Sequence, residues 1–244
     1  MSLIIVIPTY KEAENLPLMV SALLNLPRPD LNILVVDDNS PDGTGDIAER
    51  LKKETGRVDV IHRAGKLGLG TAYLEGFRHA LKQGAEIIGQ MDCDFSHPVD
   101  KVLPMCEAIP QDADLVLGSR YIPGGSLDED WPVWRKALSG FGNLYSRTIL
   151  GIPWMDVTGG FKFWSRDLLS RMPLERIRSN GYVFQVEMNY VAYLMGAKIL
   201  EMPFYFADRK IGESKMSFRI QIEAAIRVWK LLGIHKDLKN RRLV

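Results

Sequence analysis

The sequence predicts an α/β fold in which a mostly parallel sheet is flanked by helices on both faces. Short β-branched runs alternate with segments whose apolar residues recur at helical spacing. Such alternation is typical of right-handed βαβ units. The chain has 244 residues, of which 46% are hydrophobic, so it can bury a core without disulfides or other cross-links.

The first half of the chain contains five expected strands, at residues 3–7, 32–38, 58–62, 86–92 and 113–120. Helical spacing between them predicts helices within 12–26, 43–54, 69–84 and 101–109. In the second half we expect a loop at 124–132, a helix at 133–150, a helix around 183–195 and a strand near 197–206. A polar loop at 207–217 should precede an amphipathic helix at 217–234. One apolar face of that helix would carry Ile220, Ala224, Val228, Leu231 and Leu232.

Overall composition narrows the class of protein. The formal charge is +1 and the isoelectric point is near 7.7, so a nucleic-acid partner is not expected. Cys93 and Cys106 are the only cysteines, which fits a reducing, cytoplasmic setting. The N-terminus lacks the features of a signal peptide. No run approaches the roughly 18 apolar residues of a membrane span, so a soluble or peripheral protein is expected.

Turn residues, carboxylates and arginines follow the expected strands. "PTYKE" follows the first, "DDNSPDGT" the second, "HRAGKLGLG" the third, "DCDFSHP" the fourth and "SRYIPGG" the fifth. In a parallel sheet these segments meet at one edge, where such folds bind their ligands. The sequence therefore predicts a polar site at the carboxyl ends of the strands.

Asp92 and Asp94 are the strongest candidates at that edge. On an extended chain, residues two positions apart point to the same side. Two neighbouring carboxylates repel unless a cation or hydrogen-bond donors lie between them, and Mg²⁺ takes one or two carboxylates together with waters and substrate phosphates. The pair therefore predicts a clamp for a metal and a diphosphate. The alternative is a solvated acidic turn that caps the next helix.

The other candidates give weaker signals. Asp37 and Asp38 are placed to accept hydrogen bonds from a ribose or a base, whereas residues 39–43 are expected to be structural turn and cap residues. Tyr10 and Glu12 are candidates to line a nucleotide pocket, and the alternative for Glu12 is that it complements a helix dipole. The "GLG" at 68–70 follows the third strand and is not a dinucleotide fingerprint. Cationic donors for phosphates are expected from Arg209, Lys210 and Lys215 in the 207–217 loop, with Arg120 and Arg135 adding charge nearby.

Eight segments, taken in order, resemble the family 2 glycosyltransferases of the GT-A fold. They are "IPTYKEAEN", "VVDDNSPDGT", "KLGLGTAYLEG", "MDCDFSHP", "GSRYIPGG", "DVTGGFKFW", "GYVFQVEM" and "RKIGESKMS". The match runs from Ile4 to about Ser217 and is closest to the soluble catalytic form of the dolichol-phosphate (polyprenol-phosphate) mannosyltransferases. It implies a nucleotide-binding, Rossmann-like GT-A domain at 1–216, with 217–244 as an amphipathic helix and basic tail.

The resemblance also implies a reaction and a set of site residues. The reaction is inverting transfer of mannose from GDP-mannose to a dolichyl or polyprenyl phosphate, helped by Mg²⁺ or Mn²⁺. The nucleotide would be held by Pro8, Tyr10, Glu12, Val36 and Asp38. The sugar nucleotide would contact Asp92, Cys93 and Asp94, and the metal would be bound by Asp92, Asp94 and Ser96. Arg120, Arg209 and Lys215 would bind phosphates and, with Asp94, act in catalysis.

Two residues depart from the family pattern. Cys93 replaces a residue that is commonly alanine, and Ser96 stands where some relatives carry glutamine. A polyprenyl phosphate is anionic near neutral pH, so no general base is required, and His97 is interpreted as a turn residue. An alternative donor such as UDP-glucose remains open. A dinucleotide-dependent oxidoreductase is disfavoured by the "PTYKE" turn, and a non-catalytic nucleotide-sugar sensor is a third reading.

The resemblance further predicts a protein peripheral at the cytoplasmic face of a membrane. The chain lacks the transmembrane extension of many relatives, so attachment would depend on its own surface or on a membrane-anchoring partner subunit. The 217–234 helix and the cations Lys236, Lys239, Arg241 and Arg242 could lie on an anionic surface. The alternative is an ordinary helix packed on the core.

Overall fold

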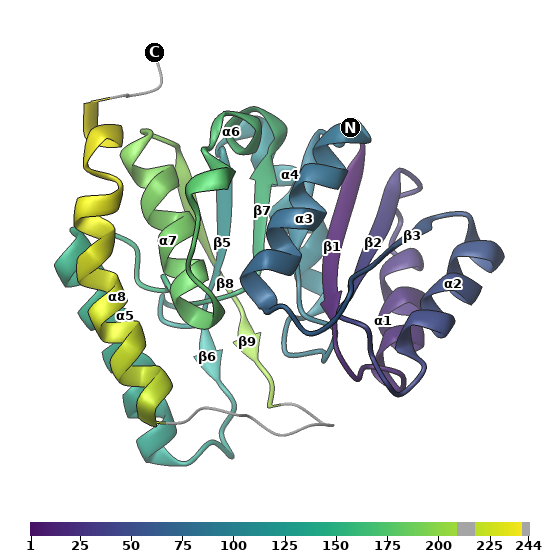
Figure 1. Ribbon diagram of the computed structural model, residues 1–244, viewed down its shortest axis with the longest axis horizontal. Coiled ribbons are helices and arrows are strands. Elements are labelled where there is room, and N and C mark those ends of the chain that lie inside the picture. Colours follow the sequence, from purple (N-terminus) through teal and green to yellow (C-terminus); the bar gives the residue numbers. More distant parts are fainter. Residues whose placement is uncertain (209–217, 241–244) are drawn as a thin grey trace.

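A seven-stranded sheet in the order β3-β2-β1-β4-β7-β5-β8 forms the centre of the molecule (Figure 1). It is seen in a computed structural model that describes residues 1–208 and 218–240. Every pair of neighbouring strands is parallel except those of β7, which runs antiparallel to both β4 and β5. The predicted α/β fold with a mostly parallel sheet is confirmed.

All five strands predicted in the first half are present. The strands of the sheet are β1 (Leu3–Thr9), β2 (Leu31–Asp37), β3 (Val58–His62), β4 (Ile87–Gln90), β5 (Leu115–Ser119), β7 (Lys162–Ser165) and β8 (Ile199–Pro203). A separate parallel pair consists of β6 (Ser126–Leu127) and β9 (Tyr205–Phe206). Since β4 ends at Gln90, two residues before the predicted end, Asp92 lies beyond the strand and Asp94 lies on a bend at residues 93–97, not on extended chain.

Helices cover both faces of the sheet, as the alternation predicts. One face packs against α1 (Asn15–Leu24), α2 (Thr44–Thr55) and α4 (Val102–Gln111), and the other against α3 (Leu69–Lys82), α6 (Arg166–Arg171) and α7 (Gly181–Leu194). Short 3₁₀ turns are η1 (Val99–Lys101), η2 (Leu174–Arg176) and η3 (Lys236–Asn240). Both faces need cover because the strands are apolar on both sides. In β1, Leu3 and Ile5 contribute to one core cluster, whereas Ile4 and Val6 contribute to the other.

Strand β7 was not predicted. It pairs along its whole length with β4, and the pairing places Lys162 opposite Gln90. Lys162 is fully buried, and its Nζ donates to Gln185 Oε1 (2.8 Å) and to the Gln185 carbonyl oxygen (3.1 Å). Burial lowers the pKa of Lys162 well below its usual value. Because Gln90 Nε2 also donates to Gln185 Oε1, this polar network joins β4, β7 and α7 beneath the carboxyl edge.

Two long helices, α5 (Val133–Leu150) and α8 (Phe218–Ile234), lie side by side at the end of the molecule opposite α2 (Figure 1). Tyr145 Oη on α5 donates to the Ala225 carbonyl (3.2 Å) and accepts from Trp229 Nε1 (3.0 Å) on α8. None of the helices in the described part of the chain combines the length and apolarity needed to cross a bilayer.

The apolar face predicted for the last helix points toward the core. Val228 and Leu231 are buried and Leu232 is half-buried, whereas the side chains of Ile220 and Ala224 lie outside the described residues. Beyond the helix, His235 Nε2 lies 2.9 Å from Glu187 Oε1 on α7, and both side chains are almost completely buried. The side of α8 that packs on the domain is therefore the one that the sequence singled out.

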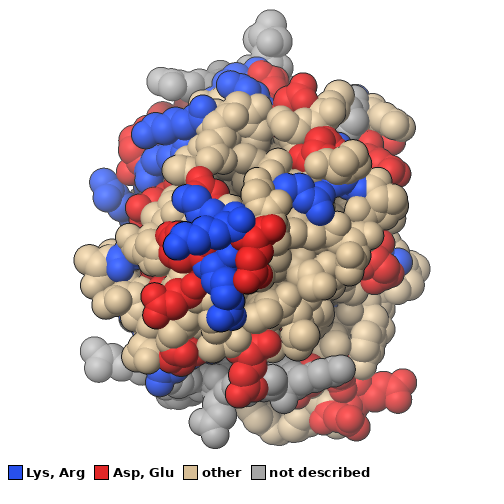
Figure 2. All heavy atoms as spheres, turned by 90° about the vertical axis from the view of Figure 1, so that its right-hand side faces the viewer, with Lys and Arg blue, Asp and Glu red and all other residues tan. Residues whose placement is uncertain are grey.

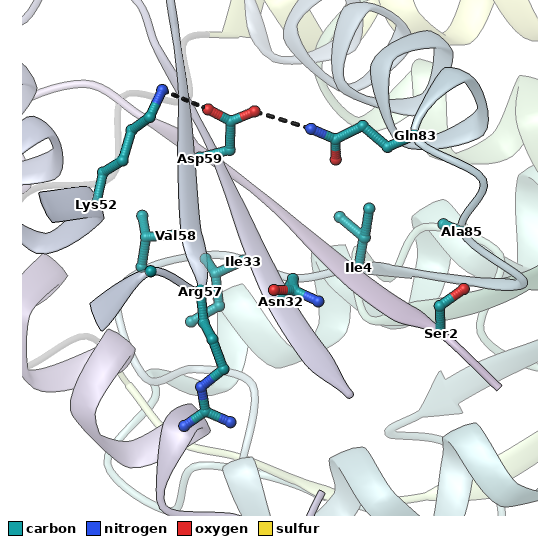
Figure 3. Close-up of a pocket in the computed structure, with 11 residues that line it drawn as sticks. Ser2, Ile4, Asn32, Ile33, Lys52, Arg57, Val58, Asp59, Gln83 and Ala85 are labelled. Carbon is teal, nitrogen blue, oxygen red and sulfur yellow. Dashed lines mark hydrogen bonds and ion pairs between the residues drawn. The ribbon is translucent and has the colours of Figure 1, made fainter. Parts of the chain in front are cut away.

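A cavity of about 630 Å³ opens at the amino ends of β1, β2 and β3. Lys52, Asp59 and Gln83 form a hydrogen-bonded row across it, above Ile4, Ile33 and Val58 (Figure 3). Its residues start the strands, so the cavity lies at the sheet edge opposite the predicted site. On the face that carries α2, positive and negative side chains are interleaved (Figure 2), and they include the ion pairs Lys52–Asp59 and Arg50–Glu54.

Candidate active site

The carboxyl edge of the sheet carries three loops with unusual backbone geometry. Lys11 (φ 63°), Asn39 (φ 54°) and Phe95 (φ 61°) adopt the left-handed conformation, which is uncommon for residues other than glycine. They lie in the loops after β1, β2 and β4 respectively, which are the loops that contain most of the predicted site residues. Strain of this kind costs of the order of 1 kcal/mol and clusters at functional sites, so it points to this edge independently of the motifs.

Asp37 has a structural role in this edge. Its Oδ1 accepts from Thr9 Oγ1 (2.9 Å) and Ser40 Oγ (2.6 Å), and its Oδ2 accepts from the Ser40 amide (3.0 Å). The following turn is tied back to the first loop, because Ser40 Oγ accepts from the Lys11 amide (3.1 Å). These bonds support the interpretation of Ser40 as a structural turn residue, and Asp42 likewise accepts from the Thr44 amide and hydroxyl, so Asp38 is the better candidate for ligand contact.

Asp38 forms a buried ion pair with Arg63, which follows β3. Arg63 Nη2 also donates to Thr71 Oγ1 on α3 (2.6 Å), and the Gly68 amide approaches Asp38 Oδ2 at 3.4 Å. The carboxylate is thus oriented by a cation and by the start of α3. Sequence reasoning did not single out Arg63 or Thr71, although "HRAGKLGLG" was placed at this edge.

The loop after β1 positions the other candidate nucleotide contacts. Lys66 Nζ lies 3.9 Å above the Tyr10 ring centroid, so a cation and an aromatic face meet at the edge. Glu12 Oε2 accepts from Asn15 Nδ2 (2.8 Å). Pro8 is paired with Val36 in the β1–β2 register. Val36 is fully buried beneath α3, so its side chain is unavailable to a ligand and only its backbone could make the implied contact.

Asp92 is held by two neighbours. Tyr73 Oη on α3 donates to Asp92 Oδ1 (3.0 Å), and burial together with the charge of Asp92 raises the pKa of Tyr73, so the hydroxyl keeps its proton. The Asp92 amide donates to His97 Nδ1 (3.0 Å), and His97 Nε2 lies 4.0 Å from Asp92 Oδ2. His97 is buried and stacked on Phe161, which supports its interpretation as a structural turn residue.

Asp94 and Ser96 lie on the same bend, on either side of the strained residue Phe95. Asp94 is buried, and its Oδ1 accepts from the Ser96 amide (3.1 Å). Cys93 between the two aspartates is buried as well. Burial, with added negative charge from Glu12 and the acidic pair, raises the pKa of Cys93 well above its usual value, so the residue remains a neutral thiol. It contributes to the core cluster beside α4.

The donor set around Asp94 fits a divalent cation. Ser96 Oγ is buried and makes no hydrogen bond among the described residues, although a buried hydroxyl normally has a partner. Within residues 1–208 and 218–240, no cluster of three or more His, Cys, Asp or Glu side chains is arranged to hold a metal ion. Asp92, Asp94 and Ser96 instead supply two carboxylates and a hydroxyl from one short segment, and these are oxygen ligands of the kind that Mg²⁺ or Mn²⁺ accepts when waters or phosphate oxygens complete the coordination.

Arg120 is locked into a buried ion pair with Asp156. Its Nε donates to Asp156 Oδ2 (2.6 Å), and its Nη2 donates to Asp156 Oδ1 (2.7 Å) and Thr158 Oγ1 (3.0 Å). Burial opposes the charge, but Asp156 outweighs this effect and raises the pKa of Arg120. The Asp156 loop is itself fixed, since Glu201 Oε1 accepts from the Asp156 amide and Asn143 Oδ1 accepts from the Val157 amide.

Aromatic side chains connect Arg120 to the rest of the edge. The Arg120 guanidinium lies 5.3 Å from the Phe206 ring, which contacts both His97 and Trp131 edge-on. Arg135 stacks 3.6 Å above Trp131, so both arginines lie at the predicted edge. Arg209, Lys210 and Lys215 lie outside the described residues, and their phosphate-binding role stays a prediction.

Comparison with known proteins decides the family. Residues 4–172 match the family model described as "Glycosyl transferase family 2". The chain belongs to glycosyltransferase family 2. Over 99% of both chains, this family 2 glycosyltransferase is 42% identical to the undecaprenyl-phosphate mannosyltransferase of Micrococcus luteus. It is 41% identical to the polyprenol monophosphomannose synthase of Mycolicibacterium smegmatis, over 94% of this chain and 87% of that protein.

Solved structures confirm the GT-A fold of this glycosyltransferase. Glucosyl-3-phosphoglycerate synthase from Mycobacterium tuberculosis, in complex with Mn²⁺, UDP and phosphoglyceric acid, superposes with a TM-score of 0.66. The alignment covers 96% of this chain and 78% of that chain at 15% identity. At this identity the likeness concerns the fold only.

Proposed function

We propose that this glycosyltransferase transfers mannose from GDP-mannose to a dolichyl or polyprenyl phosphate with inversion at the anomeric carbon. The observation that carries the proposal is the 42% identity, over nearly the full length of both chains, to an undecaprenyl-phosphate mannosyltransferase. The geometry supports it, because Asp38, the acidic segment Asp92–Asp94 and Arg120 each follow a strand at the edge where α/β folds bind nucleotides.

The side chains of this site can position and stabilise charge without a protein base. The acceptor phosphate is already ionised near neutral pH, and His97 accepts a backbone N–H in a buried position. Asp92, Asp94 and Ser96 would hold a divalent cation, which, when bound, supplies Lewis-acid stabilisation of the departing diphosphate. Arg120, oriented by Asp156, would direct its guanidinium toward the phosphates, while Arg209 and Lys215 would add positive charge there.

A donor screen tests the proposal. Purified protein is incubated with a short polyprenyl phosphate and with radiolabelled GDP-mannose, UDP-glucose or UDP-galactose, and the lipid fraction is extracted. We expect label in the lipid only with GDP-mannose, and only when Mg²⁺ or Mn²⁺ is present. Label from UDP-glucose alone would establish the alternative donor, and absence of label with every donor would favour a non-catalytic nucleotide-sugar sensor.

Apolar side chains on α5 and α8 support the proposed location at the cytoplasmic face of a membrane. On α5, Trp134, Phe141 and Leu144 are 67%, 61% and 59% exposed, and on the neighbouring α8, Ile226 and Trp229 are 53% and 58% exposed. Exposed aromatic residues of this kind are typical of membrane interfaces. Lys230 and Lys236 are also exposed, which matches an anionic lipid surface. A membrane-anchoring partner subunit remains part of the proposal.

Removing both tryptophans should weaken membrane binding. We expect the Trp134→Ser/Trp229→Ser protein to float with phosphatidylglycerol vesicles at least about fivefold less than wild type, because each change removes an aromatic anchor. Leu18→Ser is the matched control, since Leu18 is 60% exposed on α1, far from α5 and α8. Equal flotation of the double variant and wild type, with unchanged unfolding midpoints, would contradict this surface.

A further inference from the structure

Tyr73 lies in an unusual position for a core residue. It is completely buried in the cluster between the sheet, α3 and α7, where a phenylalanine would fill the same space. Its one polar atom leaves this cluster and donates to Asp92 Oδ1 at 3.0 Å. The Asp92 side chain is 29% exposed, so the bond connects the rigid interior to the carboxylate that faces the candidate site.

The ring of Tyr73 has little freedom to move. Phe184 on α7 stacks parallel to it, with centroids 6.0 Å apart and an interplanar angle of 1°, and Phe77 stacks at 5.8 Å. Gly70 allows α3 to approach the start of α7 closely, since a Cβ there would lie 2.7 Å from the Ser179 carbonyl oxygen and 2.9 Å from Phe184. The hydroxyl is therefore presented to Asp92 from a fixed point.

His97 completes the restraint on Asp92 from the other side. Its Nδ1 accepts the Asp92 amide proton, so a neutral ring carries its own proton on Nε2. That nitrogen lies 4.0 Å from Asp92 Oδ2. The Asp92 backbone is thus held by a hydrogen bond to His97, and the Asp92 carboxylate by the hydrogen bond from Tyr73, which is shorter than the 4.0 Å approach of His97 Nε2.

We propose that Tyr73 is a positioning residue that orients the Asp92 carboxylate for the metal and nucleotide diphosphate, a role that rests on the proposed function. Groups that orient metal-binding side chains in this way commonly affect metal affinity by 10- to 100-fold. No contact of Tyr73 with substrate is required.

The Tyr73→Phe variant tests this role, because it retains the stacked ring and removes only the hydroxyl. Mn²⁺ binding is measured by electron paramagnetic resonance in the presence of GDP, and in parallel with UDP. We expect the variant to bind Mn²⁺ about 10- to 100-fold more weakly than wild type. In the transfer assay, the Mn²⁺ concentration for half-maximal activity should rise by a similar factor, while kcat at saturating Mn²⁺ changes less.

Tyr190→Phe is the matched control, since Tyr190 is 3% exposed in the same core cluster and is not part of the site. Both variants should remain folded, with unfolding midpoints within about 5 °C of wild type, and Tyr190→Phe should bind Mn²⁺ normally. Wild-type Mn²⁺ affinity in Tyr73→Phe, or equal losses in both variants, would overturn the positioning role. If wild type binds Mn²⁺ and GDP but transfers no mannose, the proposed function fails while the binding titration still decides the role of Tyr73.

Discussion

We expect the Asp94→Asn variant to transfer sugar about 10³-fold more slowly than wild type, which is the largest effect of any single change at this site. Asparagine has nearly the same shape as aspartate but lacks the charge, so the proposed cation would lose its most buried carboxylate ligand. A factor of 10³ corresponds to about 4 kcal/mol of transition-state stabilisation, which is within the range attributed to electrostatic stabilisation of developing charge. Initial rates measured over a range of Mn²⁺ concentrations provide the test.

The control for this variant is Asp100→Asn, which removes a 74% exposed carboxylate from η1 in the same part of the chain. It should retain the wild-type rate, and both variants should keep the wild-type circular dichroism spectrum. Full activity of Asp94→Asn in buffer freed of divalent metal would refute the clamp formed by the acidic bend. Stabilisation of the departing diphosphate would then have to come from the cationic side chains alone, without a metal bound at Asp94.

The second large effect is expected in stability, from the Asp156→Asn variant. Arg120 and Asp156 have side-chain exposures of 6% and 0%, so removal of the carboxylate leaves a buried, uncompensated guanidinium. Breaking a buried pair in this way costs about 3–5 kcal/mol of unfolding free energy. For a protein of this size the loss corresponds to a fall of about 10 °C in the unfolding midpoint. Calorimetry or urea denaturation measures it directly.

Asp167→Asn serves as the comparison, because it breaks the exposed pair between Asp167 and Arg171, whose side chains are 74% and 40% exposed. Exposed pairs contribute about 0–1 kcal/mol, so this variant should remain close to wild type. An unfolding free energy of Asp156→Asn within 1 kcal/mol of wild type would show that Arg120 finds another partner or solvent when its carboxylate is removed.

Much of the fold followed from local pattern. The predicted helix at 133–150 matches α5 residue for residue, and the five predicted strands are all present. Helical and strand periodicities are properties of short windows, so they can be recognised without knowledge of distant contacts. The carboxyl-edge location of Asp38, Asp92 and Asp94 followed as well, because parallel strands bring their ends to one side.

The partners of the site residues could not be predicted in the same way. Tyr73 and Asp92 are 19 residues apart and Arg120 and Asp156 are 36 apart, and nothing in either local sequence indicates which buried polar group will meet which. The prediction that Asp92 and Asp94 lie on extended chain was wrong, since β4 ends at Gln90 and the chain bends at residues 93–97. The strained Phe95 on the bend is visible only in the folded backbone.

The sequence by itself therefore determined the layers of the molecule, the positions of its early strands along the chain and the edge at which polar residues collect, since periodicity locates the strands and their parallel pairing brings their ends to one side. Only the tertiary structure decided that β7 enters the sheet between β4 and β5, because a four-residue strand is stabilised by pairing with strands far away in the chain. The loop that precedes β7 in the chain carries Asp156, which pairs with Arg120 directly after β5. The same long-range packing places Tyr73 against Asp92 and so completes the site.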